Sequence, residues 1–307
     1  MEKRTFEEVA GMWLAEKKHF VKRSTFAAYS LSVAKHLVPE FGQVDDVTEE
    51  MVQRFVFRKI DGGLSHKSVK DMLVVLKMVL RYGVKYGYME RREIDVRFPT
   101  ERDRKEVEVL TVGHQQRFMK YLRSNFSFMN LGLYMCLCSG LRIGEICALK
   151  WEDIDLTAGV IRVSKTIQRI YVMDGNGTHT EIMIDTAKTM NSMRSIPIAK
   201  DLRDILRPLK KLVGANHYVL TNLPEPVEPR TYRNYYNRLM RQLGMPKLKF
   251  HGLRHSFATR CIESKCDYKT LSVLLGHSKI STTLDLYVHP NLEQKQRCVE
   301  QMFRGLR

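Results

Sequence analysis

The apolar residues of this chain follow one spacing at the start, lose it, and then follow another. Through about the first 90 residues they recur every three to four positions, which is the period of amphipathic helices. Residues 91–108 are dense in charge and show no apolar period. Strand-like stretches follow at 159–164 and 168–173, and helical patterns return after residue 201. We therefore expect a mainly α protein with a small antiparallel β-sheet (α+β): a helical domain at 1–90, a linker at 91–108 and a second domain at 109–307.

Local signals refine this division. The first helix is expected to begin at a capping box formed by Thr5-Phe-Glu-Glu. The next three helices are expected to open at Ser24, Thr48 and Ser65. The second of these helices should stop near Pro39 and Gly42. In the second domain, Asp174-Gly-Asn-Gly177 predicts a turn between two strands, and further short strands are expected at 181–184 and 194–198.

The charge balance points to a polyanionic partner. The chain carries 51 Lys and Arg against 34 Asp and Glu, a formal net charge of +17, which suits nucleic acid or a membrane surface. No apolar run is long enough to cross a bilayer and no signal region opens the chain, so a cytoplasmic location without a membrane partner is expected. Basic residues on the first-domain helices fit a surface that clasps DNA: Lys17, Lys18, Lys22, Arg23, Arg58, Lys59, Lys67, Lys77 and Lys85.

The cysteines indicate neither zinc nor disulfides. None of the six forms a Cys-x-x-Cys pair, and Cys136, Cys138 and Cys147 lie in a mostly apolar stretch. We expect buried, reduced thiols, and we expect no metal and no cofactor.

Side chains suited to chemistry on a phosphodiester stand in four short motifs. The motifs are Ser139-Gly-Leu-Arg142-Ile-Gly-Glu145, His251-Gly-Leu-Arg254-His255, Leu274-Leu-Gly-His277 and Leu286-Tyr287. Two guanidiniums match phosphate oxygens with planar forks of donors, and a tyrosine among them indicates a covalent nucleophile. An imidazole can take the phenolic proton or donate to the phosphate. The set predicts strand cleavage in DNA.

These motifs resemble a known family. Cys138 to Glu145, followed by Leu149-Lys-Trp-Glu-Asp-Ile-Asp155, is similar to the first signature box of the tyrosine recombinase (phage integrase) family. The segments from His251 and from Leu274 resemble its second box, and Ala187 to Ile198 resembles the hairpin that carries its catalytic lysine. The resemblance extends across the whole chain. It implies a helical core-binding domain, which binds DNA, followed by a tyrosine-recombinase catalytic domain.

The resemblance also implies roles for individual residues. It makes Arg142 and Arg254 the phosphate clamp, His251 the general base and His277 a hydrogen-bond donor to the phosphate. Tyr287 would be the nucleophile that forms a 3′-phosphotyrosyl linkage and frees a 5′-hydroxyl, so that religation needs neither ATP nor metal. Lys188 would protonate the leaving oxygen. We interpret Glu145 as the side chain that orients Arg142 or a neighbouring imidazole.

Several alternatives stay open at the level of sequence. Lys165, in Ser164-Lys-Thr, competes with Lys188, which is favoured because it precedes Arg-x-Ile-Pro-Ile. The alternative role for Arg142 is purely structural, as a buried arginine paired with Glu145. His255 is expected to face away from the site because it is adjacent to Arg254, and to serve a structural role.

The C-terminal segment from Asn291 to Phe303 has the apolar spacing of a short amphipathic helix. It would either pack on its own domain or, as the resemblance implies, dock on a neighbouring protomer.

The function implied is that of a site-specific recombinase or integrase of a mobile element. The resemblance implies a homotetramer on paired double-stranded DNA sites, a Holliday-junction intermediate and an accessory DNA-bending or directionality protein. A type IB topoisomerase and a non-catalytic DNA-binding relative are the alternatives. The helical first domain and the C-terminal segment favour the recombinase, and the complete residue set disfavours a non-catalytic relative. No additional N-terminal arm-binding domain is expected.

Overall fold

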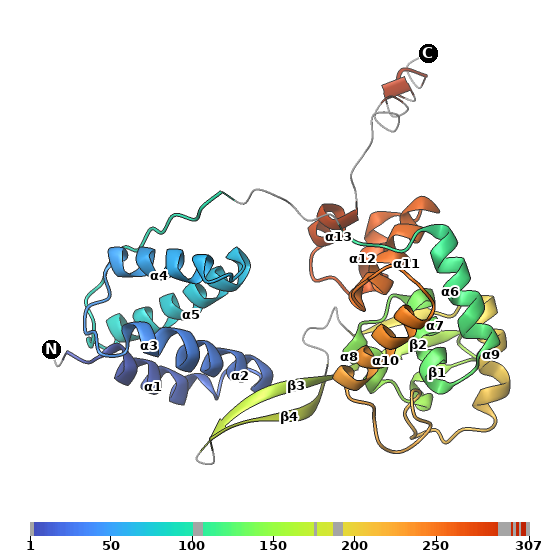
Figure 1. Ribbon diagram of the computed structural model, residues 1–307, viewed down its shortest axis with the longest axis horizontal. Coiled ribbons are helices and arrows are strands. Elements are labelled where there is room, and N and C mark those ends of the chain that lie inside the picture. Colours follow the sequence, from blue (N-terminus) through green and yellow to red (C-terminus); the bar gives the residue numbers. More distant parts are fainter. Residues whose placement is uncertain are drawn as a thin grey trace. The chain divides into compact units, whose positions relative to one another are not determined.

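A computed structural model describes residues 3–100, 107–174, 177–186, 193–287, 296, 299–300 and 302–304. The chain forms two compact units, which are drawn in Figure 1. Unit 1 contains residues 1–105 and 169–181, and unit 2 contains 106–168 and 182–307. The break near residue 105 falls inside the expected linker, but the sharing of the strands around 169–181 with unit 1 was not anticipated. The domain limits given above stay a prediction.

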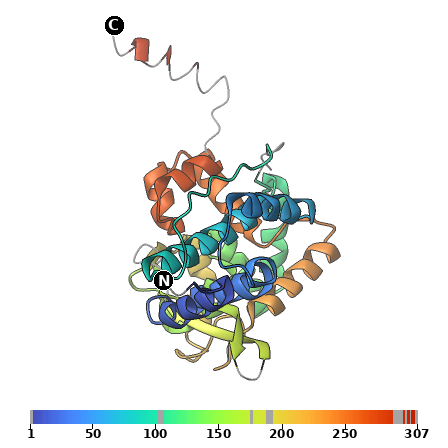
Figure 2. The same ribbon diagram turned by 90° about the vertical axis from the view of Figure 1, so that its left-hand side faces the viewer.

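Unit 1 is built from helices that lie together in both ribbon views (Figures 1 and 2). They are α1 (Phe6–Lys17), α2 (Arg23–Ser32), a π-helical turn η1 (Val33–Leu37), α3 (Val38–Phe41), α4 (Glu49–Asp61) and α5 (His66–Lys85). The Thr5 side chain accepts from the amide of Glu8, whose carboxylate accepts from the amide of Thr5, so the capping box is confirmed. The hydroxyls of Thr48 and Ser65 cap α4 and α5 by accepting from the amides of Met51 and Ser68.

The start of the second helix differs from the prediction, whereas its end agrees with it. It begins one residue early, at Arg23, with Lys22 in the cap position and no side-chain cap. The π turn carries the helix onward to Phe41, with Gly42 in the C-cap position, so the predicted stop near Pro39 and Gly42 is confirmed. Pro39 then lies in the first turn of α3, where a missing amide hydrogen is tolerated.

The core of unit 1 is aromatic and aliphatic. Phe6, Phe41 and Phe55 are fully buried, with ring centroids 5.9 Å apart for the first pair and 5.4 Å for the second. The chain after α5 stays with this core, since Ile94 and Phe98 pack against it. The first part of the expected linker is therefore attached to the helical unit.

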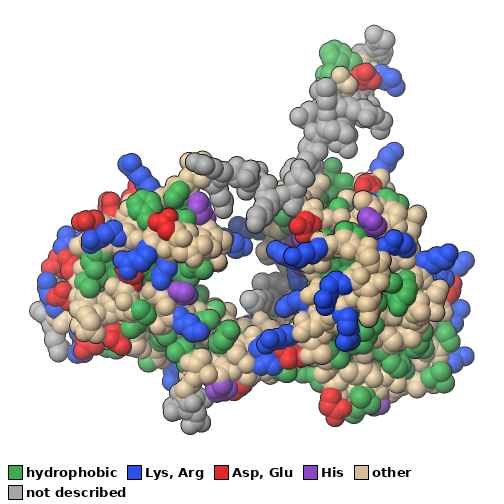
Figure 3. Space-filling model, viewed as in Figure 1, with side chains coloured by type: hydrophobic (Ala, Val, Ile, Leu, Met, Phe, Trp, Pro, Cys, Tyr) green, Lys and Arg blue, Asp and Glu red, His purple; other side chains and the backbone are tan. Residues whose placement is uncertain are grey.

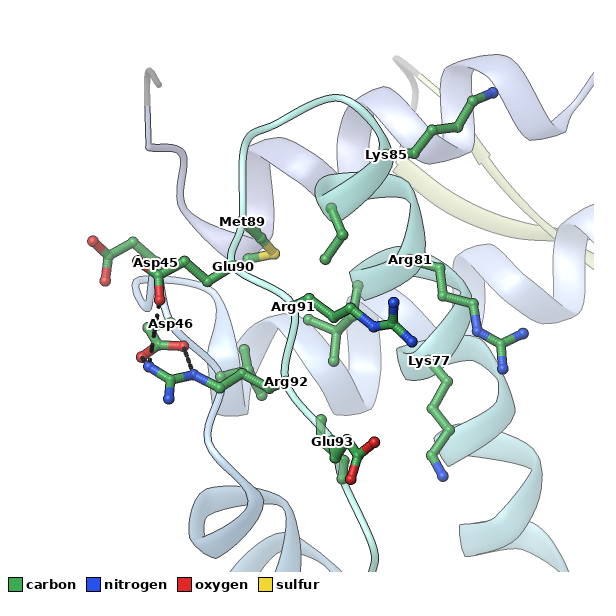
Figure 4. Close-up of a pocket in the computed structure, with 14 residues that line it drawn as sticks. Asp45, Asp46, Lys77, Arg81, Lys85, Met89, Glu90, Arg91, Arg92 and Glu93 are labelled. Carbon is green, nitrogen blue, oxygen red and sulfur yellow. Dashed lines mark hydrogen bonds and ion pairs between the residues drawn. The ribbon is translucent and has the colours of Figure 1, made fainter.

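A cavity of about 490 Å³ lies in unit 1, between α5 and the segment that follows it. Figure 4 shows Lys77 and Arg81 on α5 beside Arg91, while Arg92 turns away to make bonds of 3.1 and 2.6 Å to Asp46. No residue of the motifs singled out above lines this cavity. Its lining mixes basic and acidic side chains, which are Lys77, Arg81, Lys85, Arg91 and Arg92 with Asp45, Asp46, Glu90 and Glu93.

Unit 2 contains a three-stranded antiparallel sheet with the strand order β1–β2–β5. In its register, Ile161 on β2 is paired with Ile196 on β5. A second sheet pairs β3 with β4. The strands are β1 (Ile154–Asp155), β2 (Val160–Val163), β3 (Lys165–Asp174), β4 (Gly177–Thr186) and β5 (Arg194–Pro197). All strands expected from the sequence are present, and the mainly helical fold with small antiparallel sheets is confirmed.

The helices of unit 2 supply most of its core. They are α6 (Val112–Ser124), α7 (Phe128–Ser139), α8 (Ile143–Ala148), a 3₁₀ turn η2 (Trp151–Asp153), α9 (Lys200–Lys210), α10 (Pro229–Gln242), α11 (His251–Glu263), α12 (Tyr268–Leu275) and α13 (Ile280–Tyr287). Cys138, Cys261 and Cys266 are only half-buried, whereas Cys136 and Cys147 are buried in this core, as expected. Burial raises the pKa of both thiols, so they stay protonated.

None of the helices in the described ranges is both long and apolar enough to cross a membrane. Lys and Arg side chains are distributed over the visible face of each unit in Figure 3.

Candidate active site

Helix ends in unit 2 carry the predicted site residues. Arg142 immediately precedes α8, His251 and Arg254 lie in the first turn of α11, His277 follows α12, and Tyr287 is the last residue of α13. The charges of Arg142 and Arg254 both act on His251, His277 and Tyr287, so these side chains form one cluster.

The position of Lys188, the predicted general acid, is not described by the structure. Lys188 lies outside the described residues, which stop at 186 and resume at 193. The alternative, Lys165, is the first residue of β3. Burial raises the pKa of Asp153 and the charge of Lys165 opposes that shift, so these two side chains lie near each other.

The end of α12 explains the Leu-Leu-Gly-His motif. Gly276 adopts the left-handed conformation, with φ of 64°. The amide of Gly276 donates to the carbonyl of Val273 at 2.9 Å, and the amide of His277 donates to that of Ser272 at 3.0 Å. These two bonds make a Schellman motif, in which glycine fits because it has no Cβ. The helix therefore stops abruptly and places His277 at the site.

The next three carbonyl oxygens, those of residues 274–276, each accept a hydrogen bond from a different arginine. The bonds measure 2.7 Å from Arg194 Nε, 2.6 Å from Arg254 Nη2 and 3.2 Å from Arg142 Nη2. The last carbonyls of a helix lack partners within the helix and carry partial negative charge. One helix end thus gathers three guanidiniums.

A buried carboxylate, Glu145, compensates much of this positive charge. Arg194 binds it through two bonds of 2.9 Å, and Arg142 Nη1 binds it at 2.7 Å. The backbone amide of Arg142 also donates to Glu145, at 2.8 Å. Burial by itself would raise the pKa of this carboxyl, but the bonds and charges of Arg194 and Arg142 lower it to about 2. Glu145 is therefore ionised and fixes the guanidinium of Arg142, which is one of the two partners expected for it from the sequence.

Arg254 is almost entirely buried, at 1% exposure. Its Nη1 donates to the carbonyl of Gly140 at 2.9 Å, and Gly140, like Gly276, has φ of 64°. Burial and then the charge of Arg142 lower its pKa to about 9. Arg142 is different, because about a third of its side chain (34%) remains exposed. A phosphate can reach Arg142 from solvent.

Both predicted histidines are neutral near neutral pH. The ring of His277 is fixed through Nδ1, which lies 2.8 Å from the hydroxyl of Thr283, a buried residue of α13. Desolvation and then the charge of Arg254 lower its pKa to about 4. Desolvation also lowers the pKa of His251 to about 4, with His255 and Arg254 contributing. His251 nevertheless keeps an exposed edge, so the desolvation comes from the protein on its other sides.

The expectation that His255 faces away from the site was wrong. Its Nδ1 lies 2.5 Å from the phenolic oxygen of Tyr287, and its ring packs edge-to-face on His251 at 4.6 Å between centroids. The physical reason is the helical period: residues four apart share a face, so His255 lies over His251, whereas adjacency to Arg254 turns it away from that arginine only. Burial raises the pKa of Tyr287 to about 12, with Arg254 and Arg142 opposing the shift.

A role for Arg194 was also not predicted from the sequence, where this residue only marks the segment that follows Lys188. In the structure, β5 alternates strictly between buried and exposed positions. That alternation places Arg194 on the same inward face as Ile196, and an inward arginine needs a buried partner. The period of two was a signal that could have identified it.

Comparisons with known proteins give a consistent result. Residues 108–294 match the phage integrase family, and residues 5–59 match the N-terminal SAM-like domain of phage integrases. The chain is 26% identical over 305 residues to a protein named tyrosine recombinase XerC-like from Caldanaerobacter subterraneus. The aligned region covers 92% of this chain and 74% of that protein.

Solved structures share the fold. The Tn1549 transposon integrase in complex with a circular intermediate DNA matches with a TM-score of 0.78 at 20% identity, covering 97% of this chain and 99% of that one. A lambda integrase, solved as a tetramer bound to a Holliday junction, matches with a TM-score of 0.65 at 19% identity, covering 93% and 78%.

Proposed function

The chain belongs to the phage integrase family of tyrosine recombinases, and from that premise we propose that it cuts and rejoins DNA at specific sites through a covalent bond to Tyr287. The observation that carries the proposal is the convergence of Arg142, Arg254, His251, His277 and Tyr287 at helix ends of one unit. Each of these residues contributes a separate element of phosphodiester chemistry.

The two arginines form the proposed phosphate clamp. Attack on a phosphodiester builds negative charge on the non-bridging oxygens, and fixed donors lower that barrier because they need no reorganisation. Arg142 is held by Glu145 and by the carbonyl of Gly276. Arg254 is held by the carbonyls of Gly140 and Leu275, so the donors of both side chains are already oriented. His277, fixed through Nδ1, is left with Nε2 to bind the phosphate.

Tyr287 is the proposed nucleophile. Its oxygen attacks phosphorus and displaces the 5′-oxygen, leaving a 3′-phosphotyrosyl bond that a second 5′-hydroxyl reverses, without ATP or metal. Lys188 is the proposed general acid for the 5′-oxygen. A 5′-bridging phosphorothioate, whose sulfur leaves without a proton, should restore cleavage to Lys188→Ala but leave Lys165→Ala unchanged.

Double-stranded DNA is the proposed partner, bound as a homotetramer on paired recombination sites with a Holliday junction as intermediate. The described apolar residues of the C-terminal segment support assembly, since Val299, Met302 and Phe303 are each more than half exposed. We propose that this segment docks on a neighbouring protomer. An accessory DNA-bending or directionality protein and a cytoplasmic location complete the proposal.

The similarity to a transposon integrase supports a role in a mobile element. Neither a type IB topoisomerase nor a non-catalytic relative is favoured by the comparisons.

One experiment separates the three functions. The full chain is incubated with a suicide substrate nicked beside its recombination site, and the products are run on a denaturing gel. A recombinase gives a covalent adduct and, with paired sites, strand exchange. An adduct without strand exchange would indicate a topoisomerase, and no adduct would indicate a DNA-binding protein only.

A further inference from the structure

Thr283, on α13, is in hydrogen-bond contact with a histidine of the proposed phosphate site. We propose that Thr283 is a positioning residue: its hydroxyl donates to Nδ1 of His277 and so keeps the proton of that imidazole on Nε2, where it can donate to the phosphate. This inference rests on the proposed function, because it concerns how one donor of the same site is set.

The contact between the two side chains is short and enclosed. Thr283 Oγ1 lies 2.8 Å from Nδ1 of His277, which is an ordinary hydrogen-bond distance. Thr283 is fully buried, whereas His277 is only half-buried. The bond is therefore shielded from water at the threonine, while part of the imidazole stays open to a ligand.

The surroundings of the hydroxyl decide which atom donates. Within the described part of the chain, Nδ1 of His277 is the one hydrogen-bond partner of the Thr283 hydroxyl. If Nδ1–H were the donor, the hydroxyl hydrogen would be buried without an acceptor, and an unsatisfied buried donor is costly. Because a hydroxyl hydrogen rotates to suit its acceptor, the favoured arrangement has Thr283 donating and Nδ1 accepting.

The charges around His277 fix how many protons its ring carries. Desolvation, and then the charges of Arg254 and Arg142, lower the pKa of His277 to about 4, so the ring has a single proton near neutral pH. With Nδ1 accepting, that proton is on Nε2. Nε2–H offers a donor to a phosphate oxygen, whereas the opposite tautomer would offer a lone pair and repel it.

The helix that carries Thr283 also carries the proposed nucleophile. Thr283 and Tyr287 are four residues apart on α13, so they lie on one side of it. Tyr287 packs against the small apolar cluster that contains Leu271 and Leu275 of α12. Docking of α13 therefore positions the phenol and sets the donor of His277 together.

Two substitutions separate the hydroxyl from its packing. Thr283→Val removes the hydroxyl and keeps the branched shape, whereas Thr283→Ser keeps the hydroxyl and removes a methyl group. Thr283→Val should still bind DNA but form the covalent adduct about 10- to 100-fold more slowly, the range found when a group that orients a metal-binding histidine is removed. Thr283→Ser should stay close to the wild-type rate.

The matched control is Thr282→Val, because Thr282 is an exposed threonine on the same helix. Its rate of adduct formation should equal that of the wild type. A larger defect in Thr283→Ser than in Thr283→Val would show that the side chain acts by packing alone and would overturn the inference.

Nitrogen NMR of the full chain with isotope-labelled histidine, free of DNA, reports the tautomer directly. The signals of His277 are those missing from His277→Ala. The wild type and Thr283→Ser should show His277 protonated at Nε2, and Thr283→Val should show a mixture of tautomers. Protonation at Nδ1 in the wild type, or an unchanged Nε2 form in Thr283→Val, would overturn the inference.

A double-mutant cycle connects the tautomer to the reaction. In the His277→Ala background, Thr283→Val should slow adduct formation by less than about twofold, because two residues that act through one contact are not additive. A full additional loss would show that Thr283 acts elsewhere and would overturn the inference. Absence of any adduct from the wild type would instead overturn the proposed function, and the NMR result would still decide the tautomer.

Discussion

Three arginines share one helix end, and two of them, Arg142 and Arg194, also share the carboxylate of Glu145. The three differ in exposure. The side chains of Arg194 and Arg142 are 3% and 34% exposed, and Arg254 is 1% exposed as a whole residue. Arg142 is the most exposed of the three. Arg194 binds Glu145 through two hydrogen bonds, so we infer that it acts by positioning this carboxylate. The carboxylate is the common element, since without it two guanidiniums would lie close together with no compensating charge.

Replacement of Glu145 by Gln should therefore be strongly destabilising. Removing one member of a buried ion pair leaves uncompensated charge and costs about 3–5 kcal/mol. Urea unfolding of the full chain measures the loss. The matched control is Glu263→Gln in the same unit, where the acid is 53% exposed and paired with Arg260, and where we expect less than about 1 kcal/mol. Similar losses in the two variants would contradict the central place of Glu145.

The histidines predict how stability depends on pH. The pKa of His277 falls from its ordinary 6.5 to about 4 in the folded protein, so between these values the unfolded chain binds more protons. Its contribution to stability is complete above 6.5 and is lost as the pH falls toward 4. His277→Gln should show a shallower decline than the wild type in this window when unfolding is followed at a series of pH values. Parallel curves would mean that His277 is not desolvated as described.

At the scale of elements, glycines in the left-handed conformation set the two turns of the site. Gly140 ends α7 and Gly276 ends α12, and the carbonyl of each accepts from one of the two proposed clamp arginines. A Cβ on Gly140 would lie 2.6 Å from Phe257 Cδ1, so this turn is also tightly packed.

Gly140→Ala should consequently cost more than its backbone strain. The left-handed conformation costs a residue with a Cβ about 1–2 kcal/mol, and overpacking adds about 1–3 kcal/mol. Gly244→Ala is the matched control, because Gly244 has a similar φ of 57° and no atom within 4 Å of an added Cβ. Thermal unfolding of both variants should show the larger loss at Gly140. Equal losses would exclude the clash.

The same elements show which features a sequence can predict. Capping at Thr5 and alternation in β5 are local, and local patterns predicted most helices and strands. Applying the helical period to His251 and His255 would have placed both on one face. The convergence of arginines on α12 is different, because it joins residues 80 positions apart for Arg194 and 134 for Arg142. Packing decides such contacts, and no periodicity encodes them.

For the whole molecule, the net charge of +17 sets the expected mode of DNA binding. Lys and Arg side chains displace counterions from the duplex, so affinity should fall steeply with salt. For about 6–10 neutralised phosphates, affinity should drop about 10³- to 10⁵-fold between about 50 and 200 mM salt. Filter binding or fluorescence anisotropy measures this slope. A nearly flat dependence would exclude extensive phosphate contact.

The most direct test of the account is the identity of the covalent bond. A suicide substrate labelled separately on each side of the nick is cleaved in EDTA, the adduct is digested with trypsin, and the nucleotide-bearing peptide is sequenced by mass spectrometry. We expect Tyr287 joined to a 3′-phosphate, and no adduct from Tyr287→Phe, which removes one oxygen and preserves packing. A nucleotide on another residue, a 5′-linkage, or an adduct that persists in Tyr287→Phe would contradict the account.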